Sequence, residues 1–278
     1  MEIRYRKGFE DVIVSADDVV RHFQCHLIPT LAHYTAQSDV RFLFSQAVRN
    51  AFLRFFWDLQ DHHEQYPGEK IKPPPLDVLE GYLAAETQDL TFHDLLYSAQ
   101  LALEISRFGA RLKHLYDFIC SKCRAGMVPT LIGYGPVEAQ VGGKLFVDYD
   151  VDLLYRIRGQ DELLIVPNPF VDPWVYRALV SCYRQGLKAR DLEPKIYIGS
   201  FKRYPIVVHR EADDDMSCVR DILRGYYQVQ VGDVFPMGQH FTPGDVRGCK
   251  TCVYQRECVQ RDRGEMIAYI RELRKSAS

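Results

Sequence analysis

The chain has 278 residues, of which 47% are hydrophobic, and a formal net charge of -2 at pH 7. This length and apolar content exclude a disordered chain and are sufficient for one large domain or two small ones. The near-zero net charge excludes a general electrostatic attraction to nucleic acid, but 35 Lys and Arg against 37 Asp and Glu still allow a local basic groove.

The sequence also bears on the compartment. It has no apolar run of the roughly 18 residues that would predict a transmembrane helix. Residues 1–7 have the pattern of neither a signal peptide nor a transit peptide. We therefore expect a cytoplasmic protein without a membrane partner. In that compartment the 8 cysteines are expected to be reduced thiols or metal ligands rather than disulfides.

The first elements of the chain are a short strand and two helices. Residues 2–7 alternate in character, as in an edge strand. Ser15 is a typical helix cap, and the helix that it begins ends near Cys25. Residues 39–60 repeat apolar side chains at helical spacing, which predicts a long helix with a broad buried face.

A polar, proline-rich linker at residues 67–75 interrupts the helical pattern. Helical spacing returns over residues 76–124. We therefore expect a mainly helical region over residues 1–126 that carries the first candidate cluster cysteine, followed by a core over residues 127–278.

The pattern changes from helical to a two-residue period after Met127. Residues 145–157 alternate as in a single strand, with Asp148, Asp150 and Asp152 on the face opposite the apolar one. A turn leads from this strand into the apolar run 163–166, so we expect an antiparallel meander.

The remaining patterns continue the alternation of helices and strands. We expect a helix from Asp172 to about Leu187, a strand at 195–199 and a hairpin partner at 204–208. Further helices are expected at 214–228 and around 266–273. Together these elements predict an α/β core in which helices flank a mixed sheet.

Three cysteines near the C-terminus have the spacing of metal ligands. Cys249 and Cys252 are separated by two residues and Cys258 follows after five more, all among polar neighbours. A soft metal centre needs converging thiolates, and this segment supplies three of them locally. We therefore predict a metal site that takes its fourth ligand from elsewhere in the chain.

A second cysteine pair leaves the identity of the metal open. Cys120 and Cys123 would complete a four-thiolate zinc site with Cys249 and Cys252, a common structural arrangement. That arrangement would leave Cys258 unused. Both iron-sulfur and zinc are therefore retained as interpretations.

The order of elements and the cysteine spacing resemble the RecB-like branch of the PD-(D/E)XK nuclease superfamily. The resemblance is strongest to members with a four-iron, four-sulfur (4Fe-4S) cluster, among them CRISPR-associated exonucleases and AddB-type helicase-nuclease subunits. It covers about residues 12–34 and 137–261. It implies a restriction-endonuclease-like mixed sheet, a C-terminal segment stapled by the cluster, and Cys25, which follows a Ser-x-x-Asp helix at Ser15, as the fourth cluster ligand.

The resemblance also implies a catalytic site with Mg2+ or Mn2+, which in this family requires carboxylates on adjacent strands and a lysine. Glu138 and Asp152 stand where the family has a glutamate and its first motif aspartate. The expected (D/E)xK motif is replaced by Pro167-Asn168-Pro169, and Arg49 stands in place of the upstream histidine.

The lost motif leaves three hypotheses for the function. We expect a catalytically impaired DNA-binding or scaffold subunit of a repair or defence complex, because the lost ligand and lysine should each cost transition-state stabilisation. The alternative is an active exonuclease in which Lys195 or Lys202 supplies the lysine. The third hypothesis is a zinc-stabilised adaptor without a nucleic-acid role.

The expected partners are DNA and a larger protein complex, such as a helicase or a defence machine. Basic residues on the helix at 172–187 and just after it, together with the following hairpin, would contact a phosphate backbone. They are Arg177, Arg184, Lys188, Arg190, Lys202 and Arg203.

Overall fold

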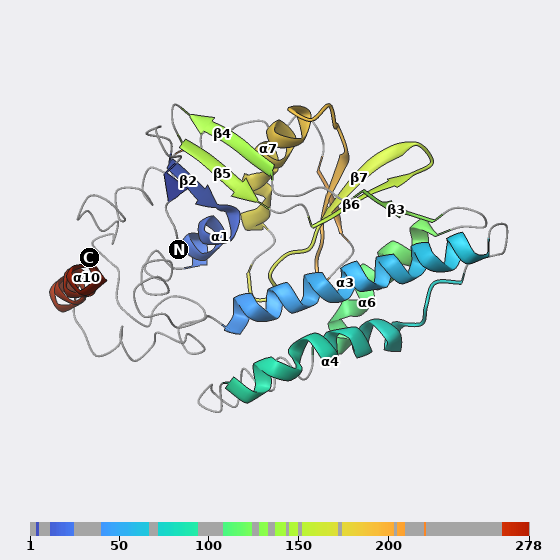
Figure 1. Ribbon diagram of the computed structural model, residues 1–278, viewed down its shortest axis with the longest axis horizontal. Coiled ribbons are helices and arrows are strands. Elements are labelled where there is room, and N and C mark those ends of the chain that lie inside the picture. Colours follow the sequence, from blue (N-terminus) through green and yellow to red (C-terminus); the bar gives the residue numbers. More distant parts are fainter. Residues whose placement is uncertain are drawn as a thin grey trace.

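The protein is α/β, with helices packed on mixed sheets (Figure 1). This architecture confirms the α/β part of the predicted fold class. The computed structural model describes residues 4–5, 12–24, 40–66, 72–93, 108–123, 128–132, 137–142, 145–149, 152–171, 174–202, 205–208, 220 and 263–277.

The first sheet has the order β1-β2-β5-β4. Its strands are β1 (Arg4–Tyr5), β2 (Val12–Ser15), β4 (Val137–Gly142) and β5 (Leu145–Tyr149). β2 is parallel to β5, whereas β4 and β5 form an antiparallel pair. A strand near the N-terminus thus belongs to the same sheet as two strands from the predicted core, across the expected boundary at residue 126.

The second sheet has the order β3-β6-β7-β8-β9. Its strands are β3 (Thr130–Leu131), β6 (Leu153–Ile157), β7 (Gln160–Ile165), β8 (Lys195–Ile198) and β9 (Ile206–Val207). β6 and β7 form a hairpin through Arg158 and Gly159, both with positive φ (53° and 75°), as in the two-residue turns that match strand twist. Helix α7 (Trp174–Lys188) then crosses over to β8, which is parallel to β7.

The prediction of one continuous strand over residues 145–157 was wrong. The structure has two strands, β5 and β6, and they belong to different sheets. Asp152 lies in a bend before β6, where its carboxylate accepts a hydrogen bond from Val166 N–H at 2.8 Å. The Asp152 side chain thus accepts the backbone N–H that a backbone carbonyl would accept in a continuous strand pair. The alternation of residue types continues through this position, so it did not reveal the break.

Helices cover both faces of the second sheet. One layer, beneath the strands in Figure 1, consists of α3 (Val40–Gln65), α4 (Leu76–His93) and α6 (Gly109–Lys122). α7 packs on the other side, and the short helix α1 (Ala16–Gln24) packs against α7, β2 and β5. The block predicted as helical over residues 76–124 contains α4 and α6, and residues 94–107 lie outside the described residues.

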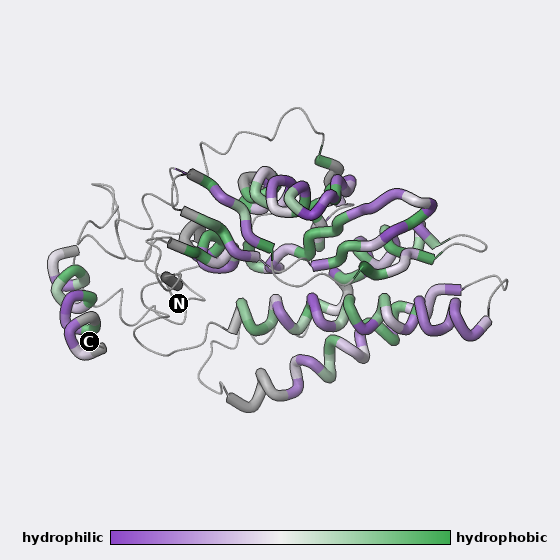
Figure 2. Tube along the Cα trace, turned by 45° about the horizontal axis from the view of Figure 1, so that its top comes forward, coloured by the Kyte–Doolittle hydropathy of each residue, from purple (hydrophilic) through white to green (hydrophobic). Residues whose placement is uncertain are grey.

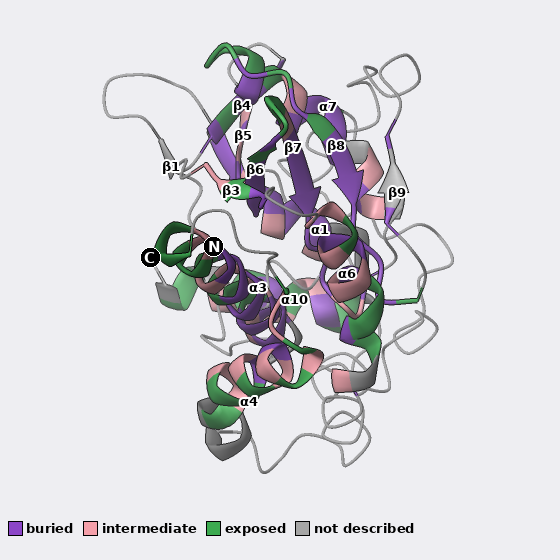
Figure 3. Cartoon of the chain, turned by 90° about the vertical axis from the view of Figure 1, so that its right-hand side faces the viewer, coloured by how far each residue is buried: buried purple, intermediate pink, exposed green. Residues whose placement is uncertain are grey.

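Alternate residues of the central strands enter two different hydrophobic clusters. Leu154, Leu163 and Ile165 pack with α7, whereas Leu153 and Leu164 pack with α3 and α6. Away from their exposed turn, both faces of β6 and β7 are therefore buried (Figure 3), which explains the apolar run in β7. Hydrophobic and hydrophilic residues alternate along α3, α4 and α6, the helices of the layer beneath the strands (Figure 2).

α7 approaches β4 closely because residue 186 is a glycine. A Cβ at Gly186 would lie 2.4 Å from Val137 Cγ1 and 2.6 Å from the Tyr149 hydroxyl. The Tyr149 hydroxyl itself donates to backbone carbonyls of α7, at 3.2 Å from Cys182 and 2.9 Å from Tyr183. This contact fixes α7 between the two sheets.

The C-terminal helix and the second hairpin confirm two further predictions. α10 (Arg263–Ala277) contains the predicted helix around 266–273, and β9 pairs antiparallel with β8 as expected for residues 204–208. Of the helix predicted at 214–228, the structure describes only residue 220, which is helical and exposed. Among the helices that the structure describes, none is long and apolar enough to cross a membrane.

Candidate functional site at the end of strand β7

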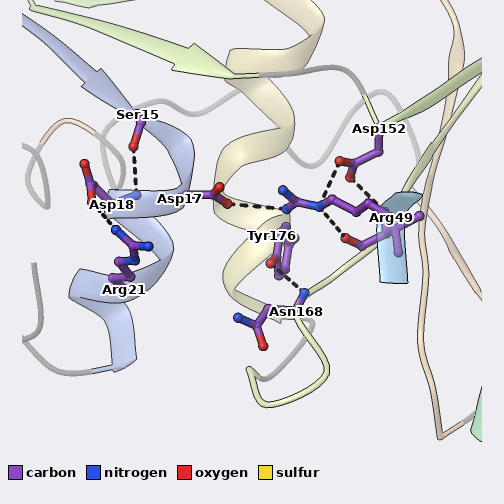
Figure 4. Close-up of polar contacts among 9 residues, drawn as sticks. Ser15, Asp17, Asp18, Arg21, Arg49, Asp152, Asn168 and Tyr176 are labelled. Carbon is purple, nitrogen blue, oxygen red and sulfur yellow. Dashed lines mark hydrogen bonds and ion pairs between the residues drawn. The ribbon is translucent and has the colours of Figure 1, made fainter. Parts of the chain in front are cut away.

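Asp152 is the centre of a buried polar cluster at the C-terminal end of β7 (Figure 4). Its side chain is 2% exposed. One carboxylate oxygen, Oδ2, accepts the Val166 N–H, and the other, Oδ1, lies 3.1 Å from Arg49 Nε. Both oxygens of the predicted catalytic carboxylate are therefore engaged by groups of the chain itself.

Arg49 extends from α3 and joins three parts of the fold. Its Nε is also 3.4 Å from the Val166 carbonyl oxygen, and its Nη2 lies 3.4 Å from Asp17 Oδ1 on α1. Burial alone would lower the pKa of Arg49, but Asp152 and then Asp17 outweigh it, so the pKa is raised well above its usual range. The guanidinium is therefore a permanent charge between two carboxylates.

The Pro167-Asn168-Pro169 turn that follows β7 is held by its asparagine. Asn168 N–H donates to the Tyr176 hydroxyl of α7 at 2.7 Å, and Asn168 Oδ1 accepts Phe170 N–H at 2.9 Å. Asn168 is 1% exposed, and its Nδ2 has no hydrogen-bond partner among the described residues. Since neither proline has an N–H to donate, Asn168 makes the polar contacts of this turn.

The residues present do not fit a divalent metal at Asp152. Mg2+ and Mn2+ need free oxygen ligands at about 2.0–2.6 Å, but both Asp152 oxygens and the Val166 carbonyl already contact Arg49 or the backbone. The described residues contain no group of three His, Cys, Asp or Glu side chains arranged to hold a metal ion.

The second predicted metal ligand, Glu138, lies in the other sheet. It is exposed on β4 and stands opposite Asp148 of β5 in the antiparallel register. The structure therefore brings Glu138 to Asp148 across the strand pair, whereas Asp152 belongs to the bend before β6. Asp150 lies outside the described residues.

The two candidate lysines lie at different ends of the second sheet. Lys195 begins β8 opposite Glu162, near the start of β7, and its Nζ lies 5.2 Å from the centre of the Tyr197 ring. Because β7 and β8 are parallel, this position is at the end of the sheet away from Val166. Lys202 follows the C-terminal end of β8, on the same side as Val166, and is exposed.

Three of the predicted DNA-contacting residues share one side of α7. Arg177, Arg184 and Lys188 are spaced by seven and four residues and are half-buried or exposed, opposite the buried face of the helix. Arg184 Nη2 donates to the Val208 carbonyl at 3.5 Å. Arg190 is exposed just after α7, and Arg203 lies outside the described residues.

Of the four candidate zinc ligands, the structure describes Cys120 and Cys123; it also describes Cys182, which is buried on α7. Cys120 and Cys123 lie at the end of α6, where burial, the largest cause for each, raises the pKa of both thiols, and that of Cys123 to about 12. The cluster candidates lie outside the described residues. They are Cys25, Cys249, Cys252 and Cys258.

Sequence reasoning missed how this centre is assembled. It singled out Asp152 and Arg49, but it gave no role to Asp17, Asn168 or the Tyr176 hydroxyl. Asp17 reads in the sequence only as an acidic residue in the first turn of a helix. Asn168 carried a local signal, since asparagine between prolines after a strand is typical of a side-chain-stabilised turn.

Comparisons with known proteins assign no family to this arrangement. No protein-family model matches the chain, and no curated protein matches it significantly. The nuclease resemblance therefore stays a prediction.

Proposed function

We propose that the protein is a catalytically impaired member of the RecB-like nuclease-fold proteins, in which a DNA-binding surface is kept on a restriction-endonuclease-like core. It would act as a DNA-reading or scaffold subunit of a repair or defence complex. The observation that carries this proposal is the engagement of Asp152 by Val166 N–H and Arg49, beside a turn that has neither carboxylate nor lysine.

The arrangement of the core supports the fold assignment. A hairpin, β6 and β7, is followed by a crossover helix and a parallel strand, and the candidate carboxylate lies at the end of that hairpin. Ligands of open α/β sheets commonly bind beyond the carboxyl ends of strands. Asp152, Arg49 and the 167–170 turn all lie at that end of β7.

The basic side of α7 supports a nucleic-acid ligand. Arg177, Arg184 and Lys188 align along the helix, and Arg190 follows it. Phosphate contacts by such residues bind DNA without reading its sequence, and binding releases counterions. A near-neutral chain with a basic stripe on α7 is suited to a local contact with the DNA backbone rather than to wrapping DNA.

A 4Fe-4S cluster on Cys25, Cys249, Cys252 and Cys258 completes the proposal. Cys25 immediately follows the last residue of α1, so a cluster bound there would tie the C-terminal segment to the helix that carries Asp17. Freshly purified protein should be brown, absorb broadly near ~400 nm and contain about four irons per chain. Stoichiometric zinc without visible absorbance would favour the site with Cys120 and Cys123 instead.

A DNA-binding titration at two ionic strengths tests the proposed ligand. The double variant Arg184→Glu/Lys188→Glu should lower the slope of log affinity against log salt by about 2 for duplex DNA, because each lost phosphate contact removes about 0.9. The matched control is Arg111→Glu/Lys113→Glu, which makes the same charge change at exposed positions of α6. Equal affinity and equal slopes for both variants would contradict a groove on α7.

The alternative, an active Mg2+- or Mn2+-dependent exonuclease, is favoured by one observation: Lys202 lies at the same end of the sheet as Asp152. Cleavage of single- and double-stranded DNA with either metal decides between the two functions. The proposal expects little or no cleavage. Strong cleavage that Asp152→Ala and Lys202→Ala each abolish would establish the exonuclease.

A further inference from the structure

We infer that Arg49 is the resident cation of the Asp152 centre and holds the position that a divalent metal would otherwise occupy. The inference deepens the proposed function and rests on its assignment of the fold, because the expected metal belongs to the nuclease resemblance. It can be tested without DNA, because it states that the Asp152 centre needs no metal ion and that its stability depends on Arg49.

The first argument is the set of atoms around the guanidinium. Asp152 Oδ1, the Val166 carbonyl and Asp17 Oδ1 lie 3.1, 3.4 and 3.4 Å from its nitrogens. Carboxylate and carbonyl oxygens from separate elements are the ligand type that Mg2+ and Mn2+ prefer. In this chain they surround an arginine side chain instead.

The second argument concerns charge and shape. Asp17 and Asp152 contribute two negative charges, and the guanidinium neutralises one of them. A divalent ion at Asp152 would meet this fixed positive charge at close range, with the remaining carboxylate oxygen bonded to Val166 N–H. The planar guanidinium of arginine also has N–H donors fixed in several directions, so it can contact oxygens on different elements. The ammonium of lysine is a compact point charge without this fixed geometry.

The third argument is the position of the ion pairs in the fold. α3 supplies Arg49, α1 supplies Asp17, and the end of the β6–β7 hairpin supplies Asp152 and Val166. Asp17 and Arg49 are 32 residues apart in the chain, and Arg49 and Val166 are 117 apart. A single half-buried cation therefore links segments that have no local reason to stay together.

Removal of the arginine should expose the oxygen set. In Arg49→Ala, the carboxylates of Asp17 and Asp152 and the Val166 carbonyl would lose the cation that all three contact. We therefore expect this variant to gain a response to Mn2+ that the wild-type chain lacks. The gain requires Asp152, so the double variant Arg49→Ala/Asp152→Asn should lose it.

The experiment uses the full-length protein without DNA, treated with EDTA and then titrated with Mn2+. Thermal unfolding and the electron paramagnetic resonance signal of free Mn2+ are recorded for the wild type, Asp152→Asn and the two Arg49 variants. The wild type should bind no more Mn2+ than Asp152→Asn does. Arg49→Ala should unfold at a lower temperature in EDTA and bind Mn2+ at least about tenfold more tightly than the wild type, with a matching rise in unfolding temperature.

Two outcomes would overturn the inference. The first is Mn2+ binding to the wild type that Asp152→Asn abolishes, and this comparison stands even if Arg49→Ala does not fold. The second is a folded Arg49→Ala that is unaffected by Mn2+. Failure of the DNA titration with no Mn2+ binding to the wild type would contradict the proposed function and leave the role of Arg49 intact.

Discussion

Each end of strand β7 has a buried carboxylate paired with a cation from the helical layer. Near the start of the strand, Glu162 lies 2.7 Å from Lys122 of α6. Beyond its end, Asp152 lies 3.1 Å from Arg49 of α3. The two cations are about equally covered, with side-chain exposures of 19% and 17%, so burial alone does not distinguish the two pairs.

The Glu162 pair is surrounded by side chains only. Its carboxylate also accepts the hydroxyls of Tyr155 and Tyr197, at 2.8 and 3.2 Å, and Lys122 donates to the Tyr197 hydroxyl at 3.0 Å. Burial opposes the charge on Lys122, but hydrogen bonds to Glu162 and Tyr197 outweigh it and raise the pKa of the amine. The polar atoms of this group are hydrogen-bonded to one another within one hydrophobic layer. Its role is therefore structural.

The Asp152 pair includes the backbone and continues to a second carboxylate. Asp152 holds Val166 N–H, Arg49 holds the Val166 carbonyl, and the chain of contacts ends at Asp17. It therefore fixes the strand end, the bend before β6 and α1 together. The difference teaches that two ion pairs of similar burial have different roles when one is built from side chains alone and the other organises the backbone of a candidate site.

The largest effect is expected from Asp152→Ala. The variant leaves the half-buried Arg49 without its nearest partner and the Val166 N–H without an acceptor, at a cost of about 3–5 kcal/mol in the free energy of unfolding. Asp152→Asn keeps an acceptor for the N–H and should recover about 1–2 kcal/mol of that cost. Urea unfolding measures both, and an equal loss for the two variants would contradict the role of the backbone contact.

Glu162→Ala should cost less, about 2–3 kcal/mol, because the flexible Lys122 stem allows the ammonium to turn toward solvent. The double change Glu162→Leu/Lys122→Met should recover part of this loss, since apolar groups fill the layer. The corresponding change Asp152→Leu/Arg49→Met should recover less, because Val166 N–H still lacks an acceptor and Asp17 loses its cation. Equal recovery at both ends, measured by the same unfolding experiment, would remove the distinction between the pairs.

Two tyrosines allow a finer comparison. Tyr176→Phe removes the acceptor of the buried Asn168 N–H and should cost about 1–2 kcal/mol. Tyr155→Phe removes one of several donors to Glu162 and should cost only about 0.5–1 kcal/mol, because Lys122 and Tyr197 still satisfy the carboxylate. Urea unfolding measures both losses in the free energy of unfolding. A smaller loss for Tyr176→Phe than for Tyr155→Phe would show that the 167–170 turn does not depend on Tyr176.

The smallest effect on stability is expected from the thiols beside the Glu162 pair. With a pKa raised to about 12 by burial, Cys123 should react with iodoacetamide at pH 8 on the order of 1000-fold more slowly in the native protein than in the urea-unfolded one. The native rate should rise about tenfold per pH unit as thiolate forms. Mass spectrometry of the alkylated peptide measures it, and rapid native labelling would show that this end of the sheet opens.

The raised pKa also determines the sign of the effect of Cys123 on stability. Its folded pKa lies above its unfolded value near 9, so its stabilising contribution is complete below pH 9 and is lost as the pH rises toward 12. Wild type and Cys123→Ala should therefore have a constant difference in unfolding free energy from pH 6 to 8 and a shrinking one above pH 9.

The sequence by itself determined the elements whose signals are local. The helical spacing predicted α3 and α7, the two-residue period and the Arg158–Gly159 turn predicted the β6–β7 hairpin, and the Ser15 cap appears as a bond from Asp18 N–H to Ser15 Oγ at 3.1 Å. These signals are readable because side-chain periodicity, turn chemistry and capping act over a few residues.

Only the tertiary structure decided which distant residues meet. It placed β2 beside β5, divided the 145–157 run at Asp152, and brought Arg49 between Asp17 and Asp152. No local pattern encodes such contacts, because they arise when strands pair and helices pack across long stretches of chain. The sequence does not show whether an arginine, aspartate or asparagine faces solvent or belongs to a buried polar cluster. In this protein the packing around the end of β7 decides that they form such a cluster.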